Sequence, residues 1–98
     1  MTLPLVLRPQ AQAEFVDASI WYETQRPGLG DEFVSEVEKV LDKIANQPDR
    51  YAIVHEDIRE APVLRFPYVV YYRVKPKSIV VIAVFHSARY AAIWQSRR

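Results

Sequence analysis

The second half of the chain contains four residues whose side chains are of the types that cleave RNA: Glu56, Arg65, His86 and Tyr90. Cleavage through the ribose 2′-hydroxyl needs a base, a cation beside the phosphorane and an acid for the leaving oxygen. Glu56 or His86 could act as the base and Arg65 could stabilise the charge, with His86 or Tyr90 as the acid. A histidine that ends a strand is more often structural, so these residues define only a candidate nuclease site.

The charges of the chain are unevenly distributed. Residues 1–57 contain eleven acidic and five basic residues, whereas residues 58–98 contain eight basic residues and a single acid, Glu60. This asymmetry predicts an anionic partner for the basic half, either nucleic acid or an acidic protein surface. Segregation of acids to helices and of arginines to strands would give the same pattern without a partner, and Arg65 could then pair with a helix acid such as Glu14.

Several classes of enzyme lack their motifs in this sequence. His55 and His86 are the only histidines and there is no cysteine, so no cluster with metal-ligand spacing exists. There is also no P-loop, no glycine-rich dinucleotide turn and no nucleophile elbow. Glu36 and Glu38 fall on different faces of a helix, which does not favour a paired-carboxylate site. We therefore expect no metal and no cofactor.

Length and composition indicate one domain over residues 1–98. Half of the residues are hydrophobic, which is enough for a core, and the absence of cysteine fits a reducing compartment. Residues 3–7 form too short an apolar run for a signal peptide, and no run approaches the roughly 18–20 apolar residues of a membrane span. We expect a soluble, cytoplasmic protein.

Two helices are predicted in the first half of the chain. Pro9 suits the first turn of a helix, and apolar residues recur at three- and four-residue spacing from residue 10 to residue 25, where Pro27-Gly28 follows as a break. A second helix, with Asp31 near its start, ends before Pro48. The short turn between them predicts an antiparallel hairpin. The apolar stripe of the second helix consists of Phe33, Val37, Val40, Leu41 and Ile44.

After residue 49 the sequence is rich in β-branched and aromatic residues that alternate with polar ones. Strands are predicted at residues 53–54, 59–66, 68–74 and 78–86, with Lys75-Pro76-Lys77 as a hairpin turn. Such tight connections make consecutive strands antiparallel neighbours. With residues 3–7 as a first strand, the order β-α-α-β-β-β-β predicts an α+β fold, in which a helical hairpin covers one face of an antiparallel sheet and the other face is open.

Strict alternation predicts which side chains share a face of the sheet. In the second of these strands they are Arg59, Ala61, Val63 and Arg65, and in the last strand they are Val80, Ile82, Val84 and His86. The pattern leaves open which faces meet the helices. Two arginines on one strand face favour solvent or a partner over the core.

The order of several short motifs resembles that of the RelE/ParE toxin superfamily. In the helical half they are Trp21-Tyr22-Glu23, then Gly28-Leu29-Gly30 with Phe33, then Pro48 and Tyr51. In the strand half they are Arg65-Phe66-Pro67-Tyr68, Tyr71-Tyr72, Val84 to His86, Arg89 and Trp94. The ordered set spans nearly the whole chain. The resemblance implies a RelE-like fold and the toxin of a type II toxin–antitoxin (plasmid stabilisation-like) system, neutralised by a cognate antitoxin in a hetero-oligomer.

Within the superfamily the pattern is closer to ParE, whose members are associated with poisoning DNA gyrase. RelE-type members cut mRNA on the ribosome with lysines on the strand after the helices, and residues 51–57 contain no lysine or arginine. The resemblance therefore implies inhibition of gyrase by binding. The alternatives are a ribosome-dependent mRNA endoribonuclease that uses the Glu/Arg/His/Tyr set, and a non-toxic relative that only binds its antitoxin. For a gyrase binder, the expected anchors are Arg59, Arg65, Arg89 and Trp94.

Overall fold

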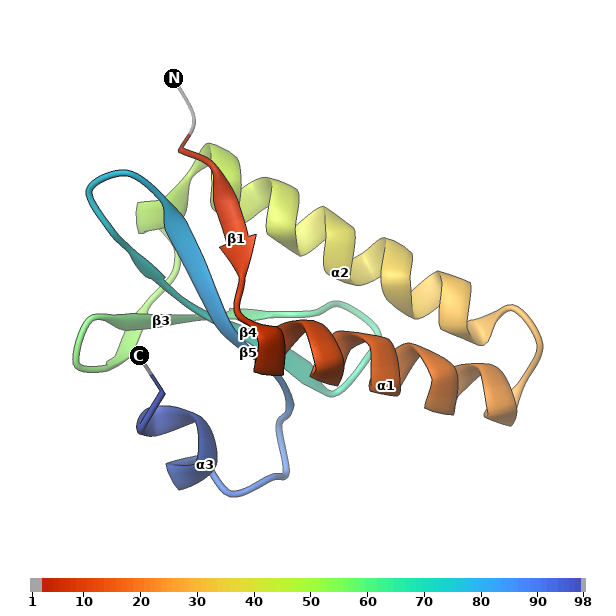
Figure 1. Cartoon of the computed structure of the whole chain (residues 1–98). Coiled ribbons are helices and arrows are strands. Elements are labelled where there is room, and N and C mark those ends of the chain that lie inside the picture. The colour runs from red at the N-terminus through yellow and green to blue at the C-terminus, as the bar shows by residue number, and fades with distance from the viewer. Residues whose placement is uncertain (1–2, 98) are drawn as a thin grey trace.

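The computed structural model describes residues 3–97 and has the predicted order of strands and helices (Figure 1). Two short elements that the sequence pattern did not indicate are added to that order, a 3-10 helix after the hairpin and a short helix near the end of the chain. The elements are β1 (Leu5–Leu7), α1 (Pro9–Gln25), α2 (Leu29–Asn46), η1 (Pro48–Arg50), β2 (Ile53–His55), β3 (Ile58–Pro62), β4 (Tyr68–Val74), β5 (Ile79–His86) and α3 (Ala92–Gln95).

The five strands form one sheet in the order β1-β5-β4-β3-β2. The last four strands are antiparallel to their neighbours, as their tight connections predicted. The first strand, β1, joins the edge of β5 in parallel, with Leu5 opposite Ile79 and Leu7 opposite Val81, so the sheet as a whole is mixed. The α+β class predicted from the sequence is confirmed.

The helical hairpin is held together at the turn between its helices. Gly28 has a φ of +88°, a conformation that favours glycine, and Glu23 of α1 accepts hydrogen bonds from the backbone N–H groups of Gly28 and Gly30, each at 3.0 Å. A Cβ at Gly30 would lie 2.6 Å from the backbone oxygen of Ser19, so only glycine permits this approach of α2 to α1. Glu23 thus caps the N-terminus of α2 from the preceding helix.

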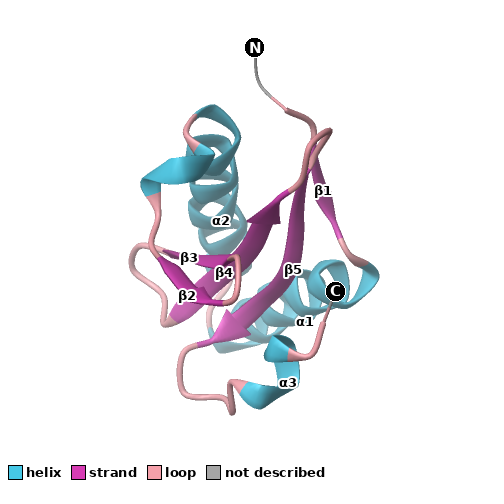
Figure 2. Ribbon diagram, turned by 90° about the vertical axis from the view of Figure 1, so that its left-hand side faces the viewer, coloured by secondary structure: helices cyan, strands magenta, loops and turns pink. Residues whose placement is uncertain are grey.

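The hairpin covers one face of the sheet and forms the larger core there (Figure 2). The predicted stripe of α2 faces this core: Phe33, Val37 and Ile44 are fully buried, and Val40 is nearly so. Leu41 is only partly buried and packs at the margin of the core. Its position one residue after Val40 turns it away from the centre of the buried stripe.

The opposite face of the sheet, which the sequence pattern left open, carries α3 (Figure 2). Trp94 of this helix is 3 % exposed and stacks on Tyr71 at a ring distance of 3.8 Å. Together with the side chains of β5 on that face it forms a second, smaller core. The expectation of an uncovered face was therefore wrong, because a four-residue helix is too short to show a helical period in the sequence.

A β-bulge in β5 changes which of its side chains share a face. Tyr71 pairs with Ala83 and Tyr72 pairs with Val81, so Ile82 is an extra residue without a partner in β4. Val84 consequently joins the core under the hairpin, whereas Ile82 joins the core under α3. The prediction that Val80, Ile82, Val84 and His86 share one face was wrong for this reason.

The second predicted strand is shorter than expected, since β3 ends at Pro62 and residues 63–67 form a turn. Arg65 lies in this turn with a φ of +72°, and therefore does not continue the strand face of Arg59. Ala61 of that face packs in the core under the hairpin. The face that carries Arg59 meets the helical half of the chain, not solvent, and its arginine finds acceptors there.

Ion pairs join the basic half of the chain to the acidic half. Arg59 pairs with Asp49 (3.5 Å), Arg65 with Glu32 and Glu36, Arg73 with Asp57 (3.2 Å), and Arg97 with Glu14 (2.9 Å). Much of the charge asymmetry seen in the sequence is therefore balanced within the fold. Among residues 3–97, no helix is long and apolar enough to cross a membrane.

The pair of Glu14 and Arg97 also completes the edge of the sheet beyond the short β1. Val84 donates its N–H to Glu14 (3.1 Å), and Arg97 donates to the backbone oxygen of Ile82 (3.0 Å). Both side chains are about 15 % exposed, and the guanidinium binds both carboxylate oxygens of Glu14. Two side chains thus satisfy the backbone groups that a longer edge strand would have satisfied.

Candidate functional site

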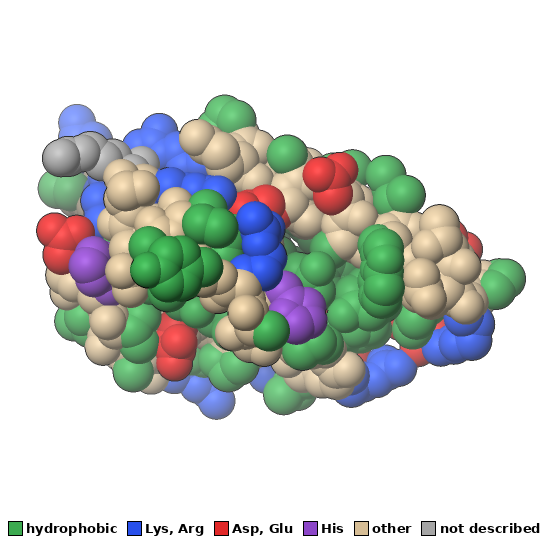
Figure 3. Space-filling view, turned by 90° about the horizontal axis from the view of Figure 1, so that it is seen from below, with side chains coloured by type: hydrophobic (Ala, Val, Ile, Leu, Met, Phe, Trp, Pro, Cys, Tyr) green, Lys and Arg blue, Asp and Glu red, His purple; other side chains and the backbone are tan. Residues whose placement is uncertain are grey.

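A groove of about 470 Å³ lies where the C-terminal half of α1 meets the ends of β4 and β5. We call it the His86 groove, and its lining residues are Trp21, Tyr22, Pro67, Tyr68, His86 and Arg89. A second hollow of about 310 Å³ adjoins it and shares Trp21, Tyr68 and Arg89. Figure 3 shows the molecule from below, where one histidine lies next to a basic side chain and hydrophobic side chains, and the other histidine lies next to an acidic side chain.

The position of His86 follows from the register of β5. It is the last residue of that strand and lies opposite Tyr68, the first residue of β4, with the two rings 5.3 Å apart. The bulge at Ile82 turns this end of β5 toward α1, which brings His86 beside Trp21 and Tyr22. Its Nδ1 accepts a hydrogen bond from the N–H of Ala88 (3.0 Å), so Nε2 is the nitrogen that can bind a partner.

Aromatic rings form the wall of the groove. Tyr22 packs against Phe33 at 5.1 Å, Phe66 at 4.8 Å and Tyr68 at 6.1 Å. Burial raises the pKa of Tyr22, and the nearby Tyr68 raises it further. Burial likewise raises the pKa of Tyr68. Both hydroxyls therefore stay protonated at neutral pH, so they offer hydrogen bonds and no negative charge.

Arg89 and Trp21 are exposed members of the groove, as is Pro67. Trp21 is 56 % exposed although it lies on a helix whose other side is buried. The Arg89 guanidinium lies 4.2 Å from the centre of the Phe85 ring, and within residues 3–97 no acidic group is close enough to pair with it. A stacked arginine without an acidic partner next to an exposed tryptophan has the composition of a protein-binding surface.

Arg65 is bound to α2 and does not line the groove. Its guanidinium donates to Glu32 and, at 3.4 Å, to the buried Glu36. The hydrogen bond from Arg65 and then that from Arg26 lower the pKa of Glu32, which keeps this carboxylate charged. Arg65 thereby fastens the turn before β4 to the N-terminal part of α2. Arg65 therefore does pair with acids of a helix, but these are Glu32 and Glu36 and not Glu14, the example considered from the sequence.

Arg59 also has its donors occupied inside the chain. It donates to the backbone oxygens of Tyr51 (2.7 Å) and Asp49 (3.3 Å) and pairs with the Asp49 carboxylate. These contacts fasten the segment around η1 to β3. The Arg59 side chain is 20 % exposed, so only a small part of it is accessible to a partner.

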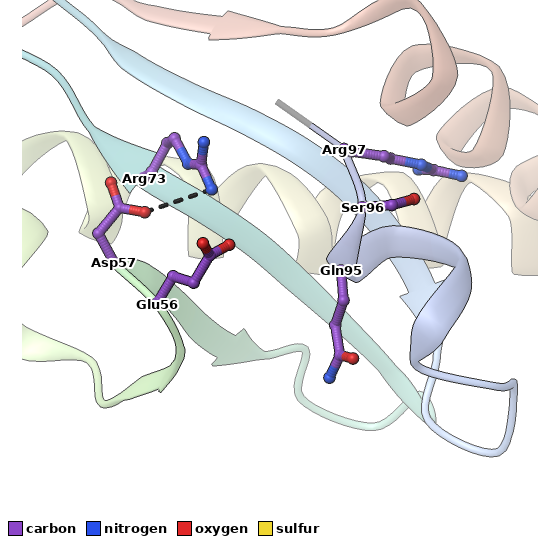
Figure 4. A pocket seen from close by; sticks show the side chains of 6 residues that line it. All are labelled: Glu56, Asp57, Arg73, Gln95, Ser96 and Arg97. Atoms are coloured by element: carbon purple, nitrogen blue, oxygen red, sulfur yellow. Dashed lines mark ion pairs between the residues drawn. The ribbon is translucent and has the colours of Figure 1, made fainter.

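The remaining predicted site residues lie elsewhere. Glu56, with a φ of +50°, lines a polar pocket of about 340 Å³ between the β2–β3 turn and the end of α3 (Figure 4). Its neighbours there are Asp57, Arg73, Gln95, Ser96 and Arg97. Tyr90 is 77 % exposed in the loop before α3, and Trp94 is buried under that helix. Trp94 could contact a partner only if α3 moved.

The four residues of the candidate nuclease set are consequently not gathered in one pocket. His86 lines the groove, Glu56 lines the pocket under α3, and Arg65 is bound to α2. Arg73 in the pocket under α3 has a buried Nε without a hydrogen-bond partner, but its guanidinium pairs with Asp57. Within the described range 3–97, no three metal-binding side chains cluster closely enough to hold an ion.

The sequence did not predict Trp21 and Tyr22 as members of this groove, although both belong to the Trp21-Tyr22-Glu23 motif. The available signal was the composition of α1, which is apolar on more than one side: its buried residues include Ala18 and Tyr22, while Val16 and Ile20 are exposed. A surface helix normally has one apolar stripe, so a second one indicates a contact.

Comparisons with known proteins agree with this fold. A family model described as "ParE toxin of type II toxin-antitoxin system, parDE" matches residues 5–90. A solved structure described as "Chromosomal ParDE TA system from P. aeruginosa" resembles the chain with a TM-score of 0.77 over 87 % of this chain and 96 % of the other. At 17 % sequence identity that likeness concerns the fold alone. None of the curated proteins compared with the chain matches it in sequence.

Proposed function

The chain belongs to the ParE toxin family of type II toxin–antitoxin systems, and from this we propose that it inhibits DNA gyrase by binding through the His86 groove. A cognate antitoxin would neutralise it in a complex of the two proteins. The cytoplasm, where gyrase acts, is the location we propose for both.

The observation that carries this proposal is the combination of Trp21 and Arg89 at the mouth of one aromatic groove. Binding energy at protein interfaces concentrates in a few aromatic and arginine anchors. Arg89 has no acid to pair with in the part of the chain that the structure describes, so an acidic surface of the target would supply one. The other anchors expected from the sequence are Arg59, Arg65 and Trp94. They would support this surface through their contacts within the chain.

A binding mechanism fits the groove better than a catalytic one. General acid–base cleavage needs a base and an acid within hydrogen-bond reach of the same reacting group. His86 has Tyr68 beside it, but the raised pKa of Tyr68 makes this hydroxyl a poor acid, and the candidate base Glu56 lines a different pocket. The groove therefore offers hydrogen-bond donors, a cation and apolar area, which are the components of recognition.

A supercoiling assay with purified gyrase tests the proposal. We expect the wild-type protein to inhibit supercoiling or to trap cleaved DNA without ribosomes, and Arg89→Ala and Trp21→Ala to weaken inhibition by about 10-fold or more each. Arg50→Ala, which removes an exposed arginine outside the groove, is the matched control and should inhibit like the wild type. His86→Ala should have a small effect, because no proton transfer depends on it.

Two outcomes would overturn the proposal. Cuts in mRNA that appear only with translating ribosomes and disappear in His86→Ala would assign the ribonuclease activity instead. Soluble, folded protein that neither arrests growth nor inhibits gyrase, but still binds the product of the adjacent gene, would identify a non-toxic relative.

A further inference from the structure

The two edges of the sheet are protected differently. β1 forms one edge and β2 forms the other, so each has a side that pairs with no strand among residues 3–97 (Figure 2). Pro4 and Pro9 flank β1, and a proline has no N–H to offer to a further strand. Residues 51–58, which include β2, contain no proline, lysine or arginine. The edge at β2 therefore lacks the residues that usually prevent a strand from pairing with another chain.

The exposed surface of β2 is apolar. Ile53 is 54 % exposed and Val54 is 42 % exposed, and Ala52 just before them is exposed as well. Apolar side chains that an added strand covers favour association, because their burial removes apolar area from water. An extended partner at this edge would thus gain backbone hydrogen bonds together with apolar contacts.

The charges at the two ends of this strand are opposite in sign. Arg50 lies directly before Tyr51, which leads into β2, and Glu56 lies directly after the strand. The Arg50 guanidinium lies 5.8 Å from the centre of the Tyr51 ring and, among residues 3–97, has no acidic group at ion-pair distance. Glu56 is exposed, and the basic side chain beside it is His55, at 3.4 Å. An antiparallel partner with the same order of charges would place an acid next to Arg50 and a base next to Glu56.

We propose that β2 pairs antiparallel with β2 of a second copy of this chain across a two-fold axis, so that the two sheets become continuous. The second copy is the occupant whose charges fit, because the axis brings Arg50 of each copy beside Glu56 of the other. The same contact forms twice, once on each side of the axis. This inference depends on the edge of the sheet and goes beyond the proposed function.

The shortness of β2 limits the strength of this contact. The strand has three residues, and its pairing with β3 is irregular between Ile53 and His55. Stable interfaces bury about 1,200–2,000 Å², and two strands of this length bury less. We therefore expect a weak, reversible dimer with a dissociation constant of about 10–100 μM.

Pairing at β2 leaves the His86 groove accessible in both copies. The lining residues of the groove come from α1, from the ends of β4 and β5 and from the loops next to these strands. In the sheet, β3 and β4 lie between β2 and β5. Dimerisation and target binding therefore use different surfaces and can be measured separately.

Sedimentation equilibrium of the complete chain over a range of concentrations tests the dimer. Ile53→Lys leaves the fold intact, since the side chain is exposed, but places a lysine on the edge strand of both copies. We expect the wild type to dimerise and this variant to associate at least about 10-fold more weakly. Val6→Lys is the matched control and should dimerise like the wild type, because Val6 is 50 % exposed on β1 at the opposite edge.

Charge reversal tests the arrangement of the two copies. Arg50→Glu and Glu56→Arg should each weaken the dimer several-fold at low salt and less at high salt, because exposed charge pairs are screened. Both substitutions in one chain exchange the charges of the two ends and should restore the affinity of the wild type. If the double variant associates as weakly as the single ones, the antiparallel two-fold arrangement is wrong. Lys77→Glu, at an exposed residue of the β4–β5 turn, is the control for the change in net charge.

Amide exchange identifies the edge that pairs. The backbone amides of β2 should exchange more slowly as the concentration of the chain rises, because they become hydrogen-bonded to the second copy. The amides of β1 should show no such dependence. Protection that rises at β1 and not at β2 would place the contact at the other edge and overturn the proposal.

Three further outcomes would also overturn it. The first is a chain that stays monomeric at about 1 mM, well above the expected dissociation constant. The second is a dimer that Ile53→Lys and Val6→Lys weaken equally, which would place the contact elsewhere. The third is an edge at β2 that binds an extended segment of another protein but not a second copy. None of these outcomes affects the supercoiling assay, which tests the proposed function on its own.

Discussion

The two faces of the sheet are covered by unequal amounts of structure. On one face, helices of 17 and 18 residues bury a large core around Phe33. On the other face, the four-residue helix α3 holds Trp94 against Tyr71, and Arg97 just beyond it binds Glu14. The same strand, β5, contributes side chains to both cores. The difference indicates that the hairpin face determines global stability and that the α3 face can open locally.

Phe33→Ala should give the largest loss of stability. The ring is fully buried and contacts Tyr22, Phe66 and Tyr68, so its removal leaves a cavity in the larger core. We expect the free energy of unfolding in urea to fall by about 3–5 kcal/mol. Leu64→Ala, at a residue that is 59 % exposed, should change it little. A small effect of Phe33→Ala would mean that the hairpin is not the main support of the sheet.

Trp94→Ala tests the opposite face. Removal of a buried indole typically costs as much as removal of a buried phenyl ring, but here the loss is limited to the free energy that holds α3 on the sheet. We expect at most about 3 kcal/mol, together with faster amide exchange confined to α3 and the exposed side of β5. If Trp94→Ala unfolded the chain as cooperatively as Phe33→Ala, the two faces would form one unit and the contrast would disappear.

Arg97→Met removes the guanidinium that binds Glu14 just beyond α3, and so measures how much this contact contributes to the attachment of α3. It leaves the backbone oxygen of Ile82 without the guanidinium donor and leaves the Glu14 carboxylate with only the N–H of Val84, which should cost about 1–2 kcal/mol. Lys77→Met, at an exposed residue of the β4–β5 turn, is the control of the same charge change. Equal melting temperatures of the two variants would show that the pair contributes nothing to the attachment of α3.

The smallest expected effect is a dependence of the free energy of unfolding on pH, caused by Tyr72 in the core under the hairpin. Burial is the main cause that raises the pKa of Tyr72 to about 12, although the nearby Arg59 lowers it. An unfolded chain would ionise this tyrosine near pH 10, so the folded state should lose stability between about pH 10 and pH 12, by at most about 1.4 kcal/mol per pH unit. Unfolding curves at pH 9 and pH 11 measure this loss. It should be reduced in Tyr72→Phe, and an unchanged pH dependence would contradict the assignment.

Local sequence signals were sufficient for the large elements of the fold. The stripe from Phe33 to Ile44 and the alternating residues of β4 have clear periods, and Gly28 marked the turn between the helices. The helix α3 was missed because four residues carry no period. The bulge at Ile82 was missed because an extra residue in an apolar strand leaves no trace in composition.

The candidate site was predictable only in part, for a related reason. His86 and Arg89 were identified by type, and both line the groove. Arg59 and Arg65 were identified by the same reasoning, but their partners Asp49 and Glu32 belong to other elements, 10 and 33 residues away in the sequence. Residue type shows which side chains can bind an anion. Only the tertiary structure shows which of them already do so within the chain.

The bulge at Ile82 has a consequence for changes in the length of β5. Deleting Ile82 would restore simple alternation and regular pairing with β4, and it would leave Val84 and His86 on the face of the hairpin. The bulge therefore accommodates one extra residue while the residues on both sides of it keep their partners in β4 and their faces of the sheet. A change of one residue in the length of this strand can be absorbed at Ile82 without displacing the end of β5 that lines the His86 groove.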